Sequence, residues 1–356
     1  MSRESSIQFL FRLFFCSLAG LVLQGCGARK SANESGLSTD LDITGNARVA
    51  RNFEAYREKT MTGCHSGGGQ GPRILISGFG PFNRKQNISG AVVDVLQRRS
   101  LWPDQRVWPR QQGFEAPDFD PDDRSGTLGA HAHQRTVWFD GRQFELCLLK
   151  VSVEWDFAAA VILHEAEKFQ PDFIFMSGYG ADLTGVRLEY AALNETSRLS
   201  GFDPQGKSLG ELNTPLSKWV LPPSLNLPQV LQMNWDPQKV ATSNAQRLAQ
   251  VSEALGRSEA NERWTFVPMN TADPLNNYIC NNVSYAVLAA LRLDSTPLAG
   301  GKLVMRPRFE KKPAAAFMHF PYEANVFSSE EVWLWAHVVM SVATSAVMQN
   351  NTLATY

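Results

Sequence analysis

The chain has 356 residues, of which 44% are hydrophobic and 19% are charged; this is a globular composition and excludes a wholly disordered protein. The length allows one large domain or two small ones. The formal net charge of -1 lacks the positive excess that a broad nucleic-acid surface needs, so we expect no nucleic acid among the partners.

Residues 1–25 have the features of a bacterial lipoprotein signal peptide. The apolar run 13–23 follows Arg3 and Arg12, and it is too short for a membrane-spanning helix, which needs about 20 residues. It has the length of a signal-peptide core. It ends in Leu23-Gln24-Gly25-Cys26, which resembles a lipobox, so Cys26 is expected to be the lipidated first residue of the mature chain. A buried N-terminal helix is the alternative.

Residues 26–72 are predicted to be a lipidated tether and a Gly-rich loop. The stretch 28–45 is polar and rich in Ser, Asn and Gly, as flexible linkers are. Gly27, and not Asp, follows the cysteine, which resembles the pattern of proteins sent to the outer membrane. We expect the protein to be anchored by lipid alone outside the cytoplasm, at the periplasmic face of a bacterial outer membrane or at the cell surface.

Beyond the tether, short apolar runs alternate with segments of helical spacing. The runs predict strands at 73–79, 136–153 (two strands around an Asp140-Gly141 turn), 173–177, 186–193, 264–269 and 314–319. The helical spacing predicts helices at 46–59, 89–98 (capped by Ser89), 157–169, 242–263, 281–292 and 329–348. Residues 101–133 show no clear period and are expected to be a long surface excursion, and residues 195–240 are irregular and Pro-rich.

This alternation predicts an α/β fold with three layers, α/β/α, around a mostly parallel central sheet. We expect residues 73–356 to form a single domain with loop insertions. In such sheets the functional groups gather in loops beyond the carboxyl ends of the strands.

Cys280 is the first candidate for chemistry because it lies at the start of the helix predicted at 281–292. A helix N-terminus favours a thiolate through the helix dipole, and its free N–H groups can hold an oxyanion. By position alone, a core cysteine is an equal alternative.

His319 and Glu189 are the other two candidates. His319 ends the apolar run 314–318 and can act as a general base to a cysteine. Glu189 lies in the mostly apolar segment 186–194, where a carboxylate faces solvent or is paired. Pairing with His319 would hold the imidazole as the third member of a triad does. Taken alone, His319 favours a structural role and Glu189 favours a position facing solvent.

Four short motifs occur in an order that resembles pyroglutamyl peptidase I, also called pyrrolidone-carboxylate peptidase, a family of cysteine peptidases. They are Gly78-Phe79-Gly80-Pro81-Phe82, the Glu189-to-Asn194 segment, Tyr278-Ile279-Cys280-Asn281, and Phe317-Met318-His319-Phe320-Pro321. The resemblance runs from Arg73 to about Met348, and it implies a Glu189, Cys280, His319 triad with Phe79 and Phe82 lining a substrate pocket.

The resemblance implies a thiol peptidase that removes an N-terminal pyroglutamyl or similar small acyl residue through a thioacyl-enzyme. The expected partner is a peptide with a blocked N-terminus, and no cofactor and no metal are expected. Some family positions differ here: the Gly-Gly-Arg loop falls on Ala181-Asp182-Leu183, a Gln on Tyr179 and an Arg on Tyr190. Two alternatives therefore stay open: a non-catalytic binding lipoprotein on the same fold, or a cysteine amidase for a different small N-terminal group.

The remaining cysteines and histidines give weaker signals. Cys64 and Cys147 could pair as a disulfide in an oxidising compartment, which the sequence alone leaves open. His131 and His133 have the spacing of a metal pair, but no third ligand has convincing spacing, so a polar loop is favoured.

Overall fold

The computed structural model describes residues 45–59, 63–67, 69, 71–80, 87–97, 130–180, 186–196, 219–254, 267–269, 278–320 and 329–350. All of the described residues lie in one compact unit, which runs from Ile43 to Tyr356. Several predicted features lie outside the described residues: the signal peptide with Cys26, the side chain of Phe82, and the 181–183 loop.

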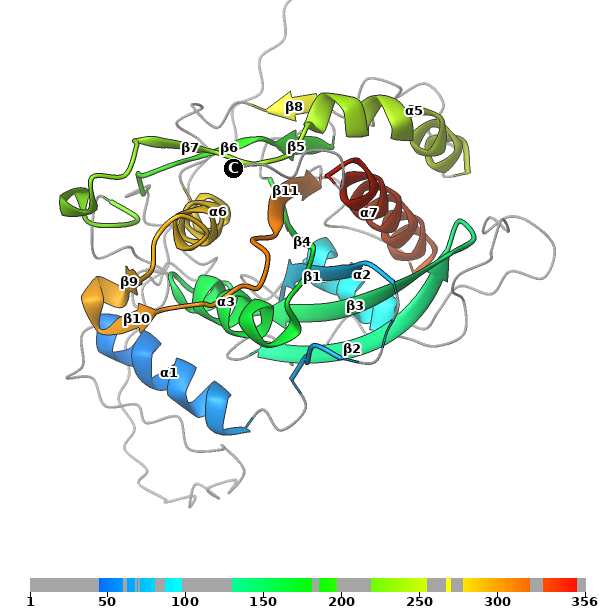
Figure 1. The fold of residues 1–356 in the computed structure, drawn as a ribbon. Helices are drawn as coiled ribbons and strands as arrows, with labels where there is room; N and C mark the ends of the chain where they lie inside the picture. Colours follow the sequence, from blue (N-terminus) through cyan, green and yellow to red (C-terminus); the bar gives the residue numbers. More distant parts are fainter. Residues whose placement is uncertain are drawn as a thin grey trace, which may run out of the picture. The chain divides into compact units, whose positions relative to one another are not determined.

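A seven-stranded mixed sheet forms the centre of this unit, in the order β2-β3-β1-β4-β11-β5-β8 (Figure 1). Its strands are β1 (Arg73–Phe79), β2 (Ala130–Phe139), β3 (Arg142–Val151), β4 (Phe173–Tyr179), β5 (Arg187–Glu189), β8 (Val267–Met269) and β11 (Ala314–Phe320). The four central strands β3, β1, β4 and β11 are mutually parallel, whereas β2 and β5 pair antiparallel with their neighbours β3 and β11. The predicted α/β class with a mostly parallel sheet is therefore confirmed.

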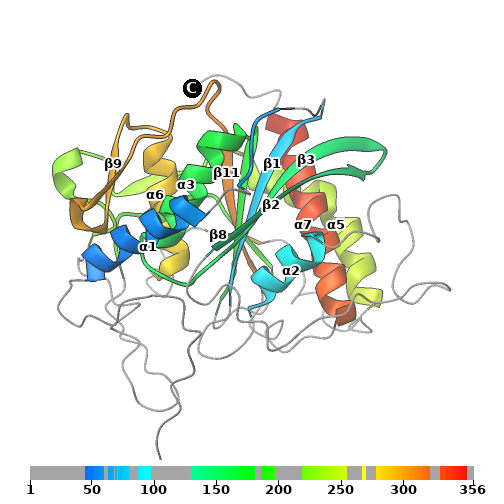
Figure 2. The ribbon, with the colours of Figure 1, turned by 90° about the horizontal axis from the view of Figure 1, so that it is seen from below.

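Helices cover both faces of this sheet, which makes three layers (Figure 2). One face carries α2 (Ile88–Gln97), α5 (Pro237–Ala254) and α7 (Ser329–Asn350), and the other carries α1 (Gly45–Lys59), α3 (Phe157–Phe169) and α6 (Ile279–Ala290). Two small antiparallel pairs, β6 (Ala191–Leu193) with β7 (Val230–Gln232) and β9 (Thr296–Leu298) with β10 (Leu303–Met305), and two short 3₁₀ turns, η1 (Pro223–Leu225) and η4 (Ala299–Gly301), complete the described elements.

The central strands are largely apolar because both of their faces are covered by helices. In β1 and β4 every residue from Ile74 to Phe79 and from Phe173 to Gly178 is buried. The antiparallel edge strand β2 instead alternates between exposed and buried positions, and Trp138 is 52% exposed there.

The close approach of α2 to β1 depends on two glycines, and the start of α2 corrects the predicted helix cap. A Cβ on Gly78 would lie 2.1 Å from the carbonyl oxygen of Ser89, and one on Gly90 would lie 2.2 Å from that of Phe79. Asn87, and not Ser89, caps the helix, because its Oδ1 accepts from the Ser89 N–H at 3.1 Å. The Ser89 hydroxyl oxygen accepts from the Phe79 N–H at 2.9 Å, so it joins α2 to β1.

Three other predicted boundaries differ from the structure. The strand expected at 186–193 divides at Tyr190, whose carbonyl accepts from the Met233 N–H, so that β5 joins the main sheet and β6 pairs with β7. β2 begins at Ala130 inside the expected excursion, because it pairs with β3 along its whole length. α5 begins at Pro237, with the preceding Asp236 carboxylate accepting from the Lys239 N–H, as a capped helix with Pro in its first turn does.

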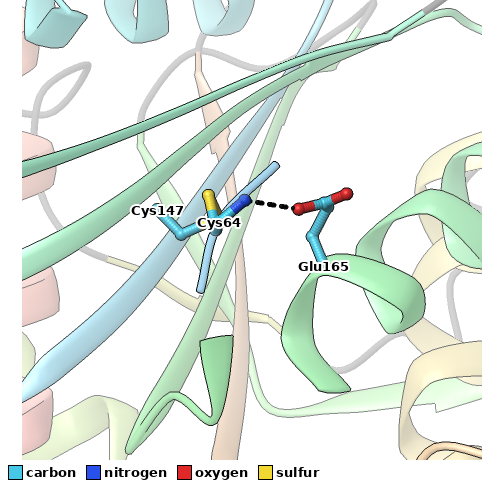
Figure 3. Close-up of side chains that lie close together, drawn as sticks. All are labelled: Cys64, Cys147 and Glu165. Atoms are coloured by element: carbon cyan, nitrogen blue, oxygen red, sulfur yellow. Dashed lines mark hydrogen bonds between the residues drawn. A yellow bond between two sulfur atoms is a disulfide. The ribbon is translucent and has the colours of Figure 1, made fainter. Parts of the chain in front are cut away.

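A disulfide joins Cys64, in the segment after α1, to Cys147 in the middle of β3. Both cysteines are fully buried. The buried Glu165 carboxylate on α3 accepts from the Cys64 N–H at 2.7 Å (Figure 3) and from the Tyr56 hydroxyl of α1 at 2.9 Å. The disulfide that the sequence left open is thus present, and it secures the segment before β1 to the sheet.

Among the described residues, one stretch, Glu331–Gln349 of α7, is long and apolar enough to cross a membrane. It is 89% buried inside the protein, where Trp333 and Trp335 are fully covered. α7 is therefore a core helix, and its two tryptophans serve packing.

Candidate active site

His319 and Glu189 lie side by side at the carboxyl end of β11. β5 runs antiparallel to β11, with Phe317 opposite Glu189 and His319 opposite Arg187, and opposed residues share one face of a sheet. The His319 Nδ1 atom lies 2.8 Å from Oε1 of Glu189, and the two side chains are 3% and 0% exposed. Glu189 thus faces the protein interior.

The groups around His319 favour the protonated form of its imidazole. Burial by itself lowers the pKa of His319, but the Glu189 carboxylate and the Cys280 side chain outweigh burial and raise it to about 10. The imidazole thus lies between the Glu189 carboxylate, with which it makes an ion pair, and the Cys280 side chain, to which it is hydrogen-bonded. A protonated imidazole that lies between a carboxylate and a thiol has the contacts of the general base in a nucleophilic triad.

Cys280 occupies the second position of α6, after Ile279 and the N-cap residue Tyr278. The first hydrogen bond of the helix runs from the Asn282 N–H to the Tyr278 carbonyl at 3.0 Å. The N–H groups of residues 279–281 therefore precede the helical ladder, as the first groups of any helix do. Cys280 is partly exposed, and it is the free cysteine among the described residues.

Gly178 of β4 leaves room for the Cys280 thiol because glycine has no Cβ. A Cβ at this position would lie 2.9 Å from the Cys280 Sγ, 3.2 Å from the Phe317 ring and 3.3 Å from the Phe79 ring. The carboxyl ends of β1, β4 and β11 thus bring Phe79, Gly178 and Phe317 together around the thiol. Phe79 is 4% exposed, so its ring both packs in the core and borders the thiol.

A second group of aromatic side chains lies beside the thiol. The Tyr278 ring meets the Trp155 ring edge to face, with centroids 5.6 Å apart. Burial, followed by the proximity of Cys280 and of Tyr179, raises the pKa of the Tyr278 hydroxyl, so Tyr278 stays neutral. Among the described residues, the side chains beside the thiol thus include several aromatic rings as well as the imidazole.

Asn281 connects the helix of Cys280 to the chain that follows Glu189. Its Oδ1 accepts from the Leu193 N–H at 2.8 Å, and its Nδ2 donates to the carbonyls of Leu193 and Glu195 at 2.8 and 2.9 Å. Leu193 ends β6, which starts two residues after Glu189. A single buried amide thus couples the two segments that carry the thiol and the carboxylate.

The sequence pattern indicated the three groups that come together and the neighbouring Asn281, which is part of the Cys280 motif. It gave no role to four residues that support them, Trp155, Asp156, Gly178 and Asn282. An Asp directly before an apolar helical segment is a cap signal, which could have drawn attention to Asp156.

Among the described residues, one group of His, Cys, Asp or Glu side chains has its potential ligand atoms within 4.8 Å of one another: Cys64, Cys147 and Glu165. Both sulfurs are consumed by the disulfide, and thiolates are the form that binds metals. The residues therefore do not fit a metal centre. His131 and His133 lie on the exposed side of the edge strand β2.

No protein-family model matches this chain, and no curated protein matches it either. Solved structures with similar arrangements include pyroglutamyl peptidase I from Bacillus amyloliquefaciens (15% identity, TM-score 0.45), covering 78% of this chain and 96% of that one. The pyrrolidone carboxyl peptidase from Thermococcus litoralis has 13% identity and a TM-score of 0.43, with coverage of 78% and 96%. A mutant of the Pyrococcus furiosus enzyme has 15% identity and a TM-score of 0.44, with coverage of 78% and 99%.

Proposed function

We propose that this chain is a cysteine peptidase that removes an N-terminal pyroglutamyl or similar small acyl residue from peptides. The observation that carries the proposal is the buried His319 imidazole, which lies 2.8 Å from the Glu189 carboxylate and hydrogen-bonds the Cys280 side chain at the start of a helix. The four motifs that resemble pyroglutamyl peptidase I contribute all three of these residues. The proposed catalytic residues are Cys280, His319 and Glu189.

In the proposed reaction the Cys280 sulfur attacks the carbonyl carbon that joins the N-terminal residue to the next one. The N–H groups at the start of α6 stabilise the oxyanion. The C–N bond breaks as His319 gives its proton to the leaving amine, and a thioacyl-enzyme remains. Water then attacks the thioester carbonyl, gives a proton to the imidazole and releases the acid, and the S–C bond breaks.

The surroundings of the thiol suit a small, flat and uncharged acyl group. Aromatic rings hold such a group by their faces, and the rings of Phe79, Phe317 and Tyr278 lie near the thiol. We assign Phe79, together with Phe82, to the substrate pocket. A charged N-terminal ammonium would lie beside an imidazole that is itself protonated, which disfavours peptides with a free N-terminus.

We further propose that the protein acts outside the cytoplasm, anchored by lipid at Cys26. The lipobox-like motif supports this localisation, and the disulfide between Cys64 and Cys147 is a second and independent support. Disulfides persist in oxidising compartments such as the bacterial periplasm and are rare in the cytosol.

A covalent probe tests the proposed peptidase directly. The full chain is treated with pyroglutamyl chloromethyl ketone, and alkylation is assigned by peptide mass spectrometry. We expect saturable labelling of Cys280, loss of this labelling in His319→Ala, and slower labelling by the matched prolyl chloromethyl ketone, which lacks the lactam carbonyl. Equal rates for both probes would indicate an amidase of different specificity. No labelling of a folded protein would favour the binding lipoprotein.

A further inference from the structure

Residues 154–156 form the turn between β3 and α3. This turn contacts two helices that are far apart in the sequence, α6 through Asp156 and α1 through Glu154. Asp156 takes the N-cap position of α3 with φ 59°, in the left-handed region, and makes no side-chain cap hydrogen bond to that helix. Non-glycine residues in this region mark strain that neighbouring contacts must maintain. The contacts of the Asp156 carboxylate show what maintains it.

The Asp156 carboxylate binds the helix of Cys280. Its Oδ1 accepts from Nδ2 of Asn282 at 2.8 Å, and the Asp156 N–H donates to Oδ1 of the same asparagine at 3.0 Å. Its Oδ2 accepts from the Ala299 N–H at 2.7 Å, where the η4 turn begins. Burial raises the pKa of the Asp156 carboxyl, and the two hydrogen bonds that the carboxylate accepts oppose that effect.

These contacts act on the first turn of α6, where the thiol lies. Asn282 follows Cys280 by two residues, and its N–H makes the first hydrogen bond of the helix. The neighbouring Trp155 packs against Tyr278, the N-cap residue on the other side of Cys280. The turn therefore holds the residues on both sides of the thiol.

Helix α1 holds the turn from the opposite side. Glu154 is 6% exposed, and its carboxylate accepts from Arg48 Nε at 3.4 Å and from Asn52 Nδ2 at 3.4 and 3.5 Å. Burial raises the pKa of Glu154, and Arg48 opposes that effect. A continuous set of contacts thus runs from α1 through Glu154 and Asp156 to Asn282.

We propose that Asp156 is a positioning residue for Cys280: by holding Asn282 it fixes the first turn of α6, and with it the thiol and the oxyanion donors, relative to His319. This inference rests on the proposed function for its effect on turnover. Its effect on thiol reactivity does not need a substrate. Misplacement of a reacting group by about 1 Å can lower the rate about 100-fold.

An exchange of the two polar side chains tests the proposal. In Asp156→Asn, an NH₂ group replaces one acceptor oxygen, so one of the two donors loses its partner. In Asn282→Asp, two carboxylates face each other. In the double variant Asp156→Asn/Asn282→Asp, the new amide would donate to the new carboxylate and accept from the Ala299 N–H, so every donor regains an acceptor.

We expect each single variant to lower kcat on a pyroglutamyl amide about 10- to 100-fold, with little change in KM, and the double variant to regain most of the loss. The substrate-free readout is the rate of Cys280 alkylation by iodoacetamide at pH 6, followed by peptide mass spectrometry. The alkylation rate should fall in each single variant and recover in the double variant, because a displaced thiol loses its contact with the imidazolium. If wild type cleaves no pyroglutamyl amide but the alkylation pattern holds, the proposed function fails and the positioning role stands.

Asp172→Asn is the matched control. Asp172 also accepts a backbone N–H, that of Arg73 at 2.9 Å, but it precedes the amino end of β4, whereas the thiol lies near the carboxyl end of that strand. The Asp172→Asn variant should leave the rate of Cys280 alkylation unchanged. Should Asp156→Asn fail to fold, Asn282→Ala removes the same contacts from the helix side and carries the test. Unchanged alkylation in either folded variant, or a double variant no better than the worse single one, overturns the proposal.

Discussion

The His319 imidazole and the Glu189 carboxylate face each other at 2.8 Å across two antiparallel strands, inside a region closed to solvent. Neither strand is adjacent to the other in the sequence: β5 precedes β8 and α6, and β11 follows them. A charged pair in such a place is costly to desolvate and needs good geometry to offset that cost. Cys280 is hydrogen-bonded to the same imidazole, so the ion pair lies where it can act on the thiol.

The three residues should behave as one catalytic unit. Cys280→Ala and His319→Ala should each lower kcat/KM on a pyroglutamyl amide at least roughly 10³-fold, and the double variant should lose little more, since residues acting together are non-additive. Glu189→Gln should cost less, because nucleophile and base both remain. Additive losses would mean that the thiol and the imidazole act separately.

The stability of the fold should depend on pH through the buried pair. The folded-state pKa of His319, about 10, is above the ordinary value of about 6.5. The contribution to the free energy of unfolding is thus complete below about pH 6.5 and is lost as pH rises towards 10. The difference in Tm between wild type and Glu189→Gln should therefore be largest near pH 6 and shrink by pH 10. Glu54→Gln, which removes an exposed ion pair with Arg57, should give a small difference at every pH; a constant difference for Glu189→Gln would contradict the assignment.

Gly178→Ala should separate activity from stability. The new Cβ would lie 2.9 Å from the Cys280 Sγ, and the thiol can avoid it by rotating. We expect a loss of turnover of about 10- to 100-fold with a change in Tm of only a few degrees. Thermal unfolding and kcat on the same preparation check this, and an unchanged kcat would show that the thiol does not work from its observed position.

Removal of the disulfide should lower stability and spare the thiol chemistry. The two cysteines are separated by 83 residues, and a loop of this size corresponds to a contribution of about 2–5 kcal/mol to the free energy of unfolding. Urea unfolding of Cys64→Ala/Cys147→Ala should show this loss, while Cys280 alkylation in the folded variant keeps its wild-type rate. Unchanged stability of wild type in dithiothreitol would argue against the bond in solution.

Substitution of the proposed lipidation site tests the localisation. Cys26→Ser should abolish metabolic labelling with a radioactive fatty acid and release the protein from the membrane fraction, because the lipid is the proposed anchor. Cys16→Ser, a change within the signal-peptide core, is the control and should keep the label. A wild-type protein that fractionates as soluble without an acyl group would refute the anchor.

The sequence by itself determined most of the layer architecture. Uninterrupted apolar runs such as 74–76 and 173–176 are typical of strands that helices cover on both faces, and both are central strands in the structure. The positions of Cys280 at a helix start and of His319 at a strand end also followed from local pattern, because caps and strand ends are local events. Ser89 shows the limit of this reasoning: its hydroxyl serves the β1 backbone, a partner that local pattern does not reveal.

Only the tertiary structure decided which distant groups meet. Glu189 taken alone could face solvent; the break at Tyr190 and the antiparallel pairing of β5 with β11 turned it towards His319. The bonds of Asp156 to Asn282 and of Cys64 to Cys147 join residues with no periodic relation to each other. Hydrophobic spacing specifies which face of an element is buried, whereas the side chain that it meets depends on strand order and register, which arise from the packing of the whole chain.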